Sequence, residues 1–161
     1  VLCAQMDIRI SYEDGNQQVI LNGKNVTSHL RDEAVGKMAS NVAVNGDVRE
    51  KLLDLQKYIA NEADVVMDGR DIGTKILPDA ELKVFLTASV DVRAKRRYDE
   101  LVAKGIESNL DVIKEDIRIR DERDMNREIS PLCQADDAVL IDSSFMTIDE
   151  VVAKIISLYN K

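Results

Sequence analysis

The sequence predicts an α/β fold: a parallel sheet with flanking helices, plus a small α+β insert. Short apolar runs at 65–67, 82–86 and 138–141 alternate with segments of helical periodicity, which favours parallel strands joined by crossover helices. The first run leads directly into a charged, glycine-containing turn, as buried parallel strands often do. The composition of the chain shifts near Asp64, so we expect two regions, 1–62 and 63–161.

The first region is predicted to form an antiparallel meander followed by two helices. Residues 6–12 alternate apolar and polar side chains, 14–16 have turn chemistry, and 18–21 return as a strand before a second turn at 22–23. A helix is expected from an N-cap at Thr27 or Ser28 through Val44. Asn45 should cap the next helix, which runs to about Ala60.

The second region should contain three strands, at the apolar runs named above, and three helices. Each helix has a recognisable start or stop signal in the sequence. The expected helices run from a cap at Ser89 to a stop at Gly105, from Asn109 or Asp111 through Asn126, and from the capping-box sequence at 147–150 to about Tyr159.

Composition limits the class of protein. A chain of 161 residues, 45% hydrophobic and 32% charged, is long enough for one domain with a true core and unlike disordered or collagen-like chains. No apolar stretch has the length of a membrane span, and residues 1–6 lack a signal-peptide pattern, so we expect a cytoplasmic protein that does not bind membranes. Cys3 and Cys133 have no metal-binding or redox spacing.

The charge distribution predicts a local anion site. A net charge of −8 argues against nucleic-acid binding, which depends on broad attraction to phosphates. Between Asp91 and Arg127, however, ten basic residues balance ten acidic ones, and seven of the eleven arginines lie there. Arginine can bind phosphate through two parallel hydrogen bonds, which favours an anion site here. The alternative interpretation is a solvent-exposed helix whose charged side chains form salt bridges with one another.

Two groups of residues carry the predicted chemistry. Asp68, Arg70 and Asp71 follow the first apolar run, where open α/β sheets bind ligands; a polar turn capped by Asp68 is the simpler alternative. On the helix that ends at Asn126, four side chains share one broad face, which could close as a lid spanning about 105–131. They are Arg120, Arg123, Asp124 and Arg127.

Together these motifs resemble bacterial cytidylate kinase, over essentially the entire chain. The resemblance rests on 67–74 (MDGRDIGT), 78–80 (PDA), 83–89 (KVFLTAS), the pair Arg96-Arg97, and 120–127 (RDERDMNR) followed by Pro131-Leu132. It implies a phosphate-loop kinase fold and transfer of the γ-phosphate of ATP to CMP or dCMP, giving CDP and ADP. It further implies Mg²⁺ with ATP as cofactor, nucleotides as partners, and a monomer when intact.

One departure from the family is large. None of the seven glycines begins the G-x-x-x-x-G-K-[ST] loop that cradles nucleotide phosphates. We therefore expect this chain to be the C-terminal part of a cytidylate kinase, without the first strand, the phosphate loop and the first acceptor-site helices, and we expect it to be inactive alone. The alternatives are a non-catalytic pyrimidine-nucleotide-binding module and an inert structural fragment.

The resemblance also implies a role for each matching residue. Ser40, Arg49 and Asp71 match the positions that recognise cytosine, and Arg120 and Asp124 match the ribose contacts. Arg70 and Arg127 match the arginines on the acceptor and transferring phosphates, and Arg123 resembles a further lid arginine. Asp68 matches the acid that holds Mg²⁺ through water, and Arg96 is expected near the nucleotide. Residues 1–62 would belong to the CMP-binding domain.

Overall fold

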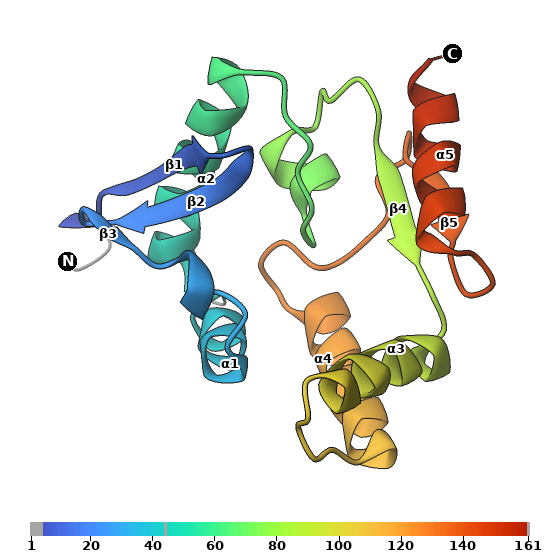
Figure 1. The fold of residues 1–161 in the computed structure, drawn as a ribbon. Coiled ribbons are helices and arrows are strands. Elements are labelled where there is room, and N and C mark those ends of the chain that lie inside the picture. The colour runs from blue at the N-terminus through green and yellow to red at the C-terminus, as the bar shows by residue number, and fades with distance from the viewer. Residues whose placement is uncertain (1–4, 44, 161) are drawn as a thin grey trace. The chain divides into compact units, whose positions relative to one another are not determined.

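The computed structural model describes residues 5–43 and 45–160, and of Glu33 and Ser40 only the backbone. The chain divides after Asp64 into two compact units (Figure 1). The α/β class with a parallel sheet and helices is confirmed.

The first unit contains an antiparallel sheet whose strand order is β1-β2-β3. The strands are β1 (Ile8–Glu13), β2 (Asn16–Leu21) and β3 (Lys24–Asn25). Both connections are two-residue turns, Asp14-Gly15 and Asn22-Gly23, in which all four residues have positive φ. Such turns match the twist of paired strands, which is why these dipeptides predicted the meander correctly.

The two helices of the first unit are α1 (Glu33–Val42) and α2 (Gly46–Glu62). The cap of α2 is confirmed, because the side-chain oxygen of Asn45 accepts from the Val48 amide at 3.2 Å. The predicted start of α1 at Thr27 or Ser28 is wrong. The Thr27 hydroxyl instead accepts from the Val19 amide of β2 at 2.8 Å, and residues Thr27–His29 form only a short 3₁₀ turn.

The second unit begins with an extended segment where the sequence predicted a strand at 65–67. That prediction is wrong for the described residues: no strand pairs with this segment, and Val66 is fully exposed. Extended apolar residues become a strand only when a neighbour accepts their backbone hydrogen bonds. The chain then makes a π-helical turn, Ile72–Ile76, in which the Ile76 and Leu77 amides donate to carbonyls five residues back.

The sheet of the second unit pairs β4 (Val84–Thr87) with β5 (Val139–Asp142) in parallel. Between them in the chain come α3 (Val90–Ala103) and α4 (Leu110–Asn126), which pack against each other and cross (Figure 1). This βαα crossover confirms the predicted parallel pairing. The stop at Gly105 is also confirmed, since its φ is +70° and the Ile106 amide donates back to Leu101 across the helix end.

The last helix, α5 (Ile148–Tyr159), starts with the predicted capping box. The Glu150 amide donates to the Thr147 hydroxyl at 3.2 Å, and the Glu150 carboxylate accepts from the Thr147 amide at 2.8 Å. Hydrogen bonds from the Thr147 amide and hydroxyl lower the pKa of Glu150. The helix start is thus satisfied by its own first turn.

The buried apolar core is small. Among the described residues the buried apolar side chains are Ile76, Ala88, Ala94 and Ile141, all from the second unit. Ala88 directly follows β4 and Ile141 belongs to β5, so burial concentrates near the carboxyl end of the parallel pair. Large apolar side chains such as Leu86, Phe145 and Ile148 remain exposed. No described helix is long and apolar enough to cross a membrane.

We predict that Thr147→Ala destabilises the protein by about 1 kcal/mol, because the Glu150 amide loses its acceptor. Urea unfolding at pH 7 measures the change, and Thr147→Ser, which keeps the hydroxyl, should stay close to the unmodified protein. The pKa of Glu150 is lowered in the folded protein. The stabilisation that the Glu150 carboxylate contributes to the cap is therefore present above the ordinary pKa of the group. It is lost as the pH falls through the lowered pKa of the folded protein. A Thr147→Ala effect that grows at acidic pH would contradict this account.

Candidate functional site

The loop that follows the extended segment carries Asp68, Arg70 and Asp71. Asp68 is exposed, Arg70 is partly buried and Asp71 is buried. The π-helical turn holds Asp71 in place, because the Asp71 carbonyl accepts from the Lys75 and Ile76 amides at 2.9 and 3.3 Å. Gly69 packs so closely that an added Cβ would lie 2.8 Å from Ile72 Cγ1. The loop geometry is therefore set by tight local packing.

The end of α4 supplies the opposing side chains, and the loop after it folds back to support them. The Leu132 amide donates to the Asp124 carbonyl at 2.8 Å, and Arg127 Nε donates to the Ser130 carbonyl at 2.6 Å. Ser130 has a φ of +50° although it precedes Pro131, a position that normally favours extended backbone. This strained turn directs a carbonyl at Arg127.

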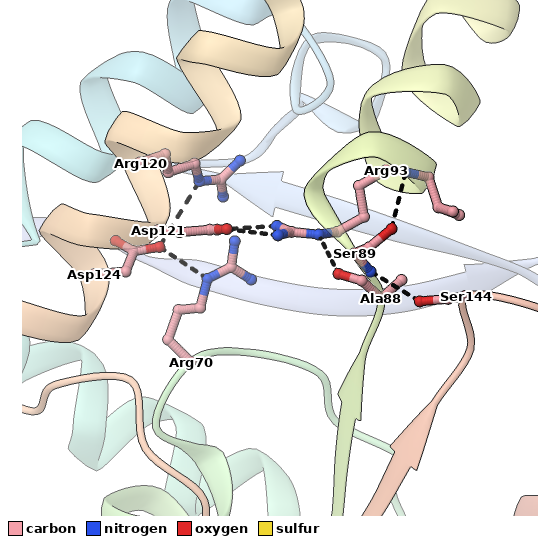
Figure 2. A network of polar contacts seen from close by, with 9 residues as sticks. Arg70, Ala88, Ser89, Arg93, Arg120, Asp121, Asp124 and Ser144 are labelled. Carbon is pink, nitrogen blue, oxygen red and sulfur yellow. Dashed lines mark hydrogen bonds and ion pairs between the residues drawn. The ribbon is translucent and has the colours of Figure 1, made fainter.

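The loop and the helix are joined by two crossed arginine–aspartate pairs. Arg70 Nε donates to Asp124 Oδ2 at 2.9 Å, as Figure 2 shows. In the second pair the arginine comes from the end of α4 and the aspartate from the loop: Arg127 Nη2 lies 3.9 Å from Asp71 Oδ1. Each element thus gives one cation and one anion to the other. We call Arg70, Asp71, Arg120, Asp124 and Arg127 the crossed-pair site.

Three of the five side chains in the crossed-pair site are almost completely buried. The side chains of Asp124, Asp71 and Arg127 are only 8%, 11% and 9% exposed. Among the described residues, Arg127 Nη2 has no hydrogen-bond partner although it is buried. A buried guanidinium nitrogen without an acceptor is costly, so the site is set up to receive one.

The crossed-pair site carries an excess of positive charge. Arg120 Nε lies 3.8 Å from Asp124 Oδ2, so Asp124 sits between the guanidiniums of Arg70 and Arg120 (Figure 2). Burial and the nearby charge of Arg70 lower the pKa of Arg120. Three arginines surround two carboxylates, and an anionic ligand would relieve this repulsion. Guanidiniums bind phosphate and carboxylate groups through two parallel hydrogen bonds, so both kinds of anion fit this cluster.

The other predicted site residues lie in different settings. Arg123 is exposed on α4. Arg96 Nη2 donates to the Ser143 and Met146 carbonyls at 2.7 and 3.3 Å, so its guanidinium holds the loop after β5. Its predicted contact with nucleotide, like the other predicted roles, stays a prediction.

Ser40 and Arg49 belong to the first unit. Arg49 Nη1 donates to the Ala43 carbonyl at 3.1 Å, which joins the start of α2 to the end of α1. The side chain of Ser40 lies outside the part of the chain that the structure describes. The predicted cytosine contacts of these two residues therefore stay predictions.

Sequence reasoning missed two residues beside the site, Arg93 and Asp121. They form a two-pronged ion pair between α3 and α4, with nitrogen–oxygen distances of 3.0 and 2.6 Å. Their separation of 28 residues gives no local pairing signal, since helical side chains meet their neighbours at three or four residues. The one available hint was that Asp121 interrupts the run of arginines on α4.

Comparisons with known proteins point to a single family. The family model described as cytidylate kinase matches residues 1–161. A cytidylate kinase of Lactobacillus johnsonii is 49% identical over 154 residues, which is 96% of this chain and 67% of that protein. One from Leuconostoc mesenteroides is 48% identical, over 98% of this chain and 70% of that protein. One from Streptococcus pneumoniae is 51% identical, over 89% of this chain and 64% of that protein.

We predict that Gly69→Ala destabilises the protein by about 1–3 kcal/mol, because the new Cβ would collide with Ile72 and displace the loop. Urea unfolding measures the loss. Gly73→Ala is the matched control: its Cβ would lie 3.3 Å from Lys83 Cδ, part of a flexible stem, so its cost should be clearly smaller. Equal losses for the two variants would show that the close approach at Gly69 is not a constraint.

Proposed function

Because this chain belongs to the cytidylate kinase family, we propose that its crossed-pair site binds the phosphate and ribose of CMP or dCMP. In the complete reaction the γ-phosphate of ATP passes to this nucleotide, giving CDP or dCDP and ADP. The observation that carries the proposal is the buried Arg127 Nη2, which has no hydrogen-bond partner among the described residues. A phosphate oxygen of the nucleotide would be its acceptor.

The neighbouring groups support distinct roles in nucleotide binding. Arg70 and Arg127 approach the site from opposite elements, so a phosphate between them would be held by two guanidiniums. Asp124 is buried and already orients Arg70 and Arg120, and its carboxylate can accept from a ribose hydroxyl. Asp71, also buried, can accept from the amine of cytosine. We assign Ser40 and Arg49 the remaining cytosine contacts.

The proposed reaction is direct attack of a nucleotide phosphate oxygen on the γ-phosphorus of ATP. The new phosphorus–oxygen bond forms as the bond to the bridging β–γ oxygen breaks, and ADP leaves with that bond's electron pair. Such transfers depend on alignment and on neutralising charge on the equatorial oxygens. Arg70 and Arg127 supply fixed positive charge for this purpose, and Arg123 would add to it from α4 when the lid region, about 105–131, closes.

We propose Asp68 as the carboxylate that holds Mg²⁺ through water. Among the described residues, no group of three or more histidine, cysteine or acidic side chains could enclose a metal ion. A single exposed carboxylate nevertheless fits Mg²⁺, which keeps several waters and is usually bound by one or two carboxylates plus substrate phosphates. When bound, Mg²⁺ neutralises charge on the ATP phosphates.

The second candidate function is a pyrimidine-nucleotide-binding module that does not transfer phosphate. It is favoured by the absence of a G-x-x-x-x-G-K-[ST] loop from the printed residues, because that loop anchors the ATP phosphates. Incubation of the 161-residue chain with CMP and MgATP, with and without a supplied phosphate-loop segment, separates the candidates. CDP formation only when that segment is supplied would support the kinase, whereas CMP binding without CDP formation in both mixtures would favour the module.

We predict that the protein binds CMP at least about tenfold more tightly than UMP, because the Asp71 carboxylate accepts from the cytosine amine and would face a carbonyl in uracil. Asp71→Asn should remove most of this preference. Isothermal titration calorimetry with both nucleotides measures it, and Asp79→Asn, at an exposed position of the same segment, is the control. Equal affinities, or a preference unchanged by Asp71→Asn, would reject the assignment.

We predict that Arg127→Ala weakens CMP binding by about tenfold to a hundredfold, the cost of losing a charged hydrogen bond to phosphate. Binding of cytidine, which lacks the phosphate, should change much less. Where a phosphate loop is supplied and turnover is measurable, the same change should lower turnover by on the order of 10³. Arg118→Ala, an exposed arginine of α4 paired with Glu115, is the control. Equal losses for CMP and cytidine would argue against phosphate as the partner of Arg127.

A further inference from the structure

All three guanidinium nitrogens of Arg93 are engaged. Nη1 and Nη2 donate to the two carboxylate oxygens of Asp121 at 3.0 and 2.6 Å, and Nε donates to the Ala88 carbonyl at 2.9 Å (Figure 2). Arg93 lies on α3, Asp121 on α4, and Ala88 directly after β4. A single side chain therefore ties the two helices to the carboxyl end of the sheet.

This junction restricts the two helices more than the ion pair between Lys114 and Asp91, which also joins them. The side chains of Arg93 and Asp121 are 35% and 21% exposed, and the planar fork matches the carboxylate at two points. Lys114 of α4 pairs with Asp91 of α3 through one ammonium, and these side chains are 49% and 73% exposed. Exposed pairs of that kind hold geometry weakly.

The position of Asp121 on α4 links the junction to the crossed-pair site. Asp121 directly follows Arg120 and precedes Asp124 by three residues, a spacing that puts two side chains on neighbouring parts of a helix face. Fixing Asp121 therefore fixes the rotation of α4 about its axis, and with it the direction of Asp124. The sheet end is itself fixed, since the Ser89 amide donates to the Ser144 hydroxyl at 2.9 Å.

We propose that Arg93 is a positioning residue: through Asp121 it sets the rotation of α4, so that Asp124 meets Arg70 and Arg120 in the crossed-pair site. The importance of this positioning for nucleotide binding rests on the function proposed above. The positioning itself does not, because it concerns contacts within the protein. A test without nucleotide therefore separates a failure of this inference from a failure of the proposed function.

The test is NMR of the 161-residue chain, reading the side-chain Nε–H of Arg70, which donates to Asp124 at 2.9 Å. Arg93→Lys keeps the charge but loses the fork, and Asp121→Asn keeps the shape but loses the charge. We expect each variant to shift the Arg70 Nε–H resonance and to raise its hydrogen-exchange rate about tenfold, the equivalent of one weakened hydrogen bond. In the double variant, the exchange rate of the Arg70 Nε–H should be no more than about twofold higher than in the more strongly affected single variant, because both substitutions break the same ion pair.

Lys114→Gln is the matched control, because it removes the exposed α3–α4 ion pair and should leave the Arg70 exchange rate within about twofold of the original. Thermal melting is recorded alongside. A lower melting temperature with an unchanged Arg70 resonance and exchange rate would show a merely structural role and overturn the inference. If Asp121→Asn does not fold, Arg93→Lys decides the question alone. Weaker CMP binding in the same variants would then connect positioning to function.

Discussion

The crossed pairing of Arg70 with Asp124 and of Arg127 with Asp71 is the interaction on which the rest of the site depends. Neither the loop after the extended segment nor the end of α4 can turn without separating a buried charge from its partner. Removing one member of such a pair leaves an uncompensated charge, which is why the arrangement holds its geometry. The turn at Ser130 and the π-helical turn after Asp71 help to hold the same two pairs in place.

The electrostatics of the molecule are divided between its surface and this site. The chain carries a net charge of −8, yet the crossed-pair site joins three guanidiniums to two carboxylates. Distant exposed charges are screened by salt, whereas partly buried charges at close range act strongly on one another. The local site can therefore attract a small anionic group despite the acidic surroundings.

Packing in the second unit is concentrated where the site needs rigidity. Ala88 and Ile141 are buried near the carboxyl end of the parallel pair, while Leu86 in the same strand is exposed. Arg93 and Arg96 bind backbone carbonyls at that same end, from Ala88 and from the loop after β5. These hydrogen bonds therefore help to hold the end of the sheet, and they fix orientation better than apolar contacts, which are non-directional.

The sequence by itself determined the local features whose signals lie within a few residues. The turns at Asp14-Gly15 and Asn22-Gly23, the caps at Asn45 and Ser89, and the stop at Gly105 are confirmed because backbone sterics and nearest acceptors decide them. Through spacing and the family resemblance, it also singled out the charged residues that the structure brings together in the crossed-pair site; their roles stay predictions.

The tertiary structure alone decided everything that depends on a distant partner. Residues 65–67 have strand composition but no paired neighbour, and the Thr27 hydroxyl serves β2 instead of capping a helix. The partner of Arg93 lies 28 residues away, and those of Arg70 and Asp71 more than 50 residues away. Such pairings follow from how helices and strands pack, and no local pattern encodes them.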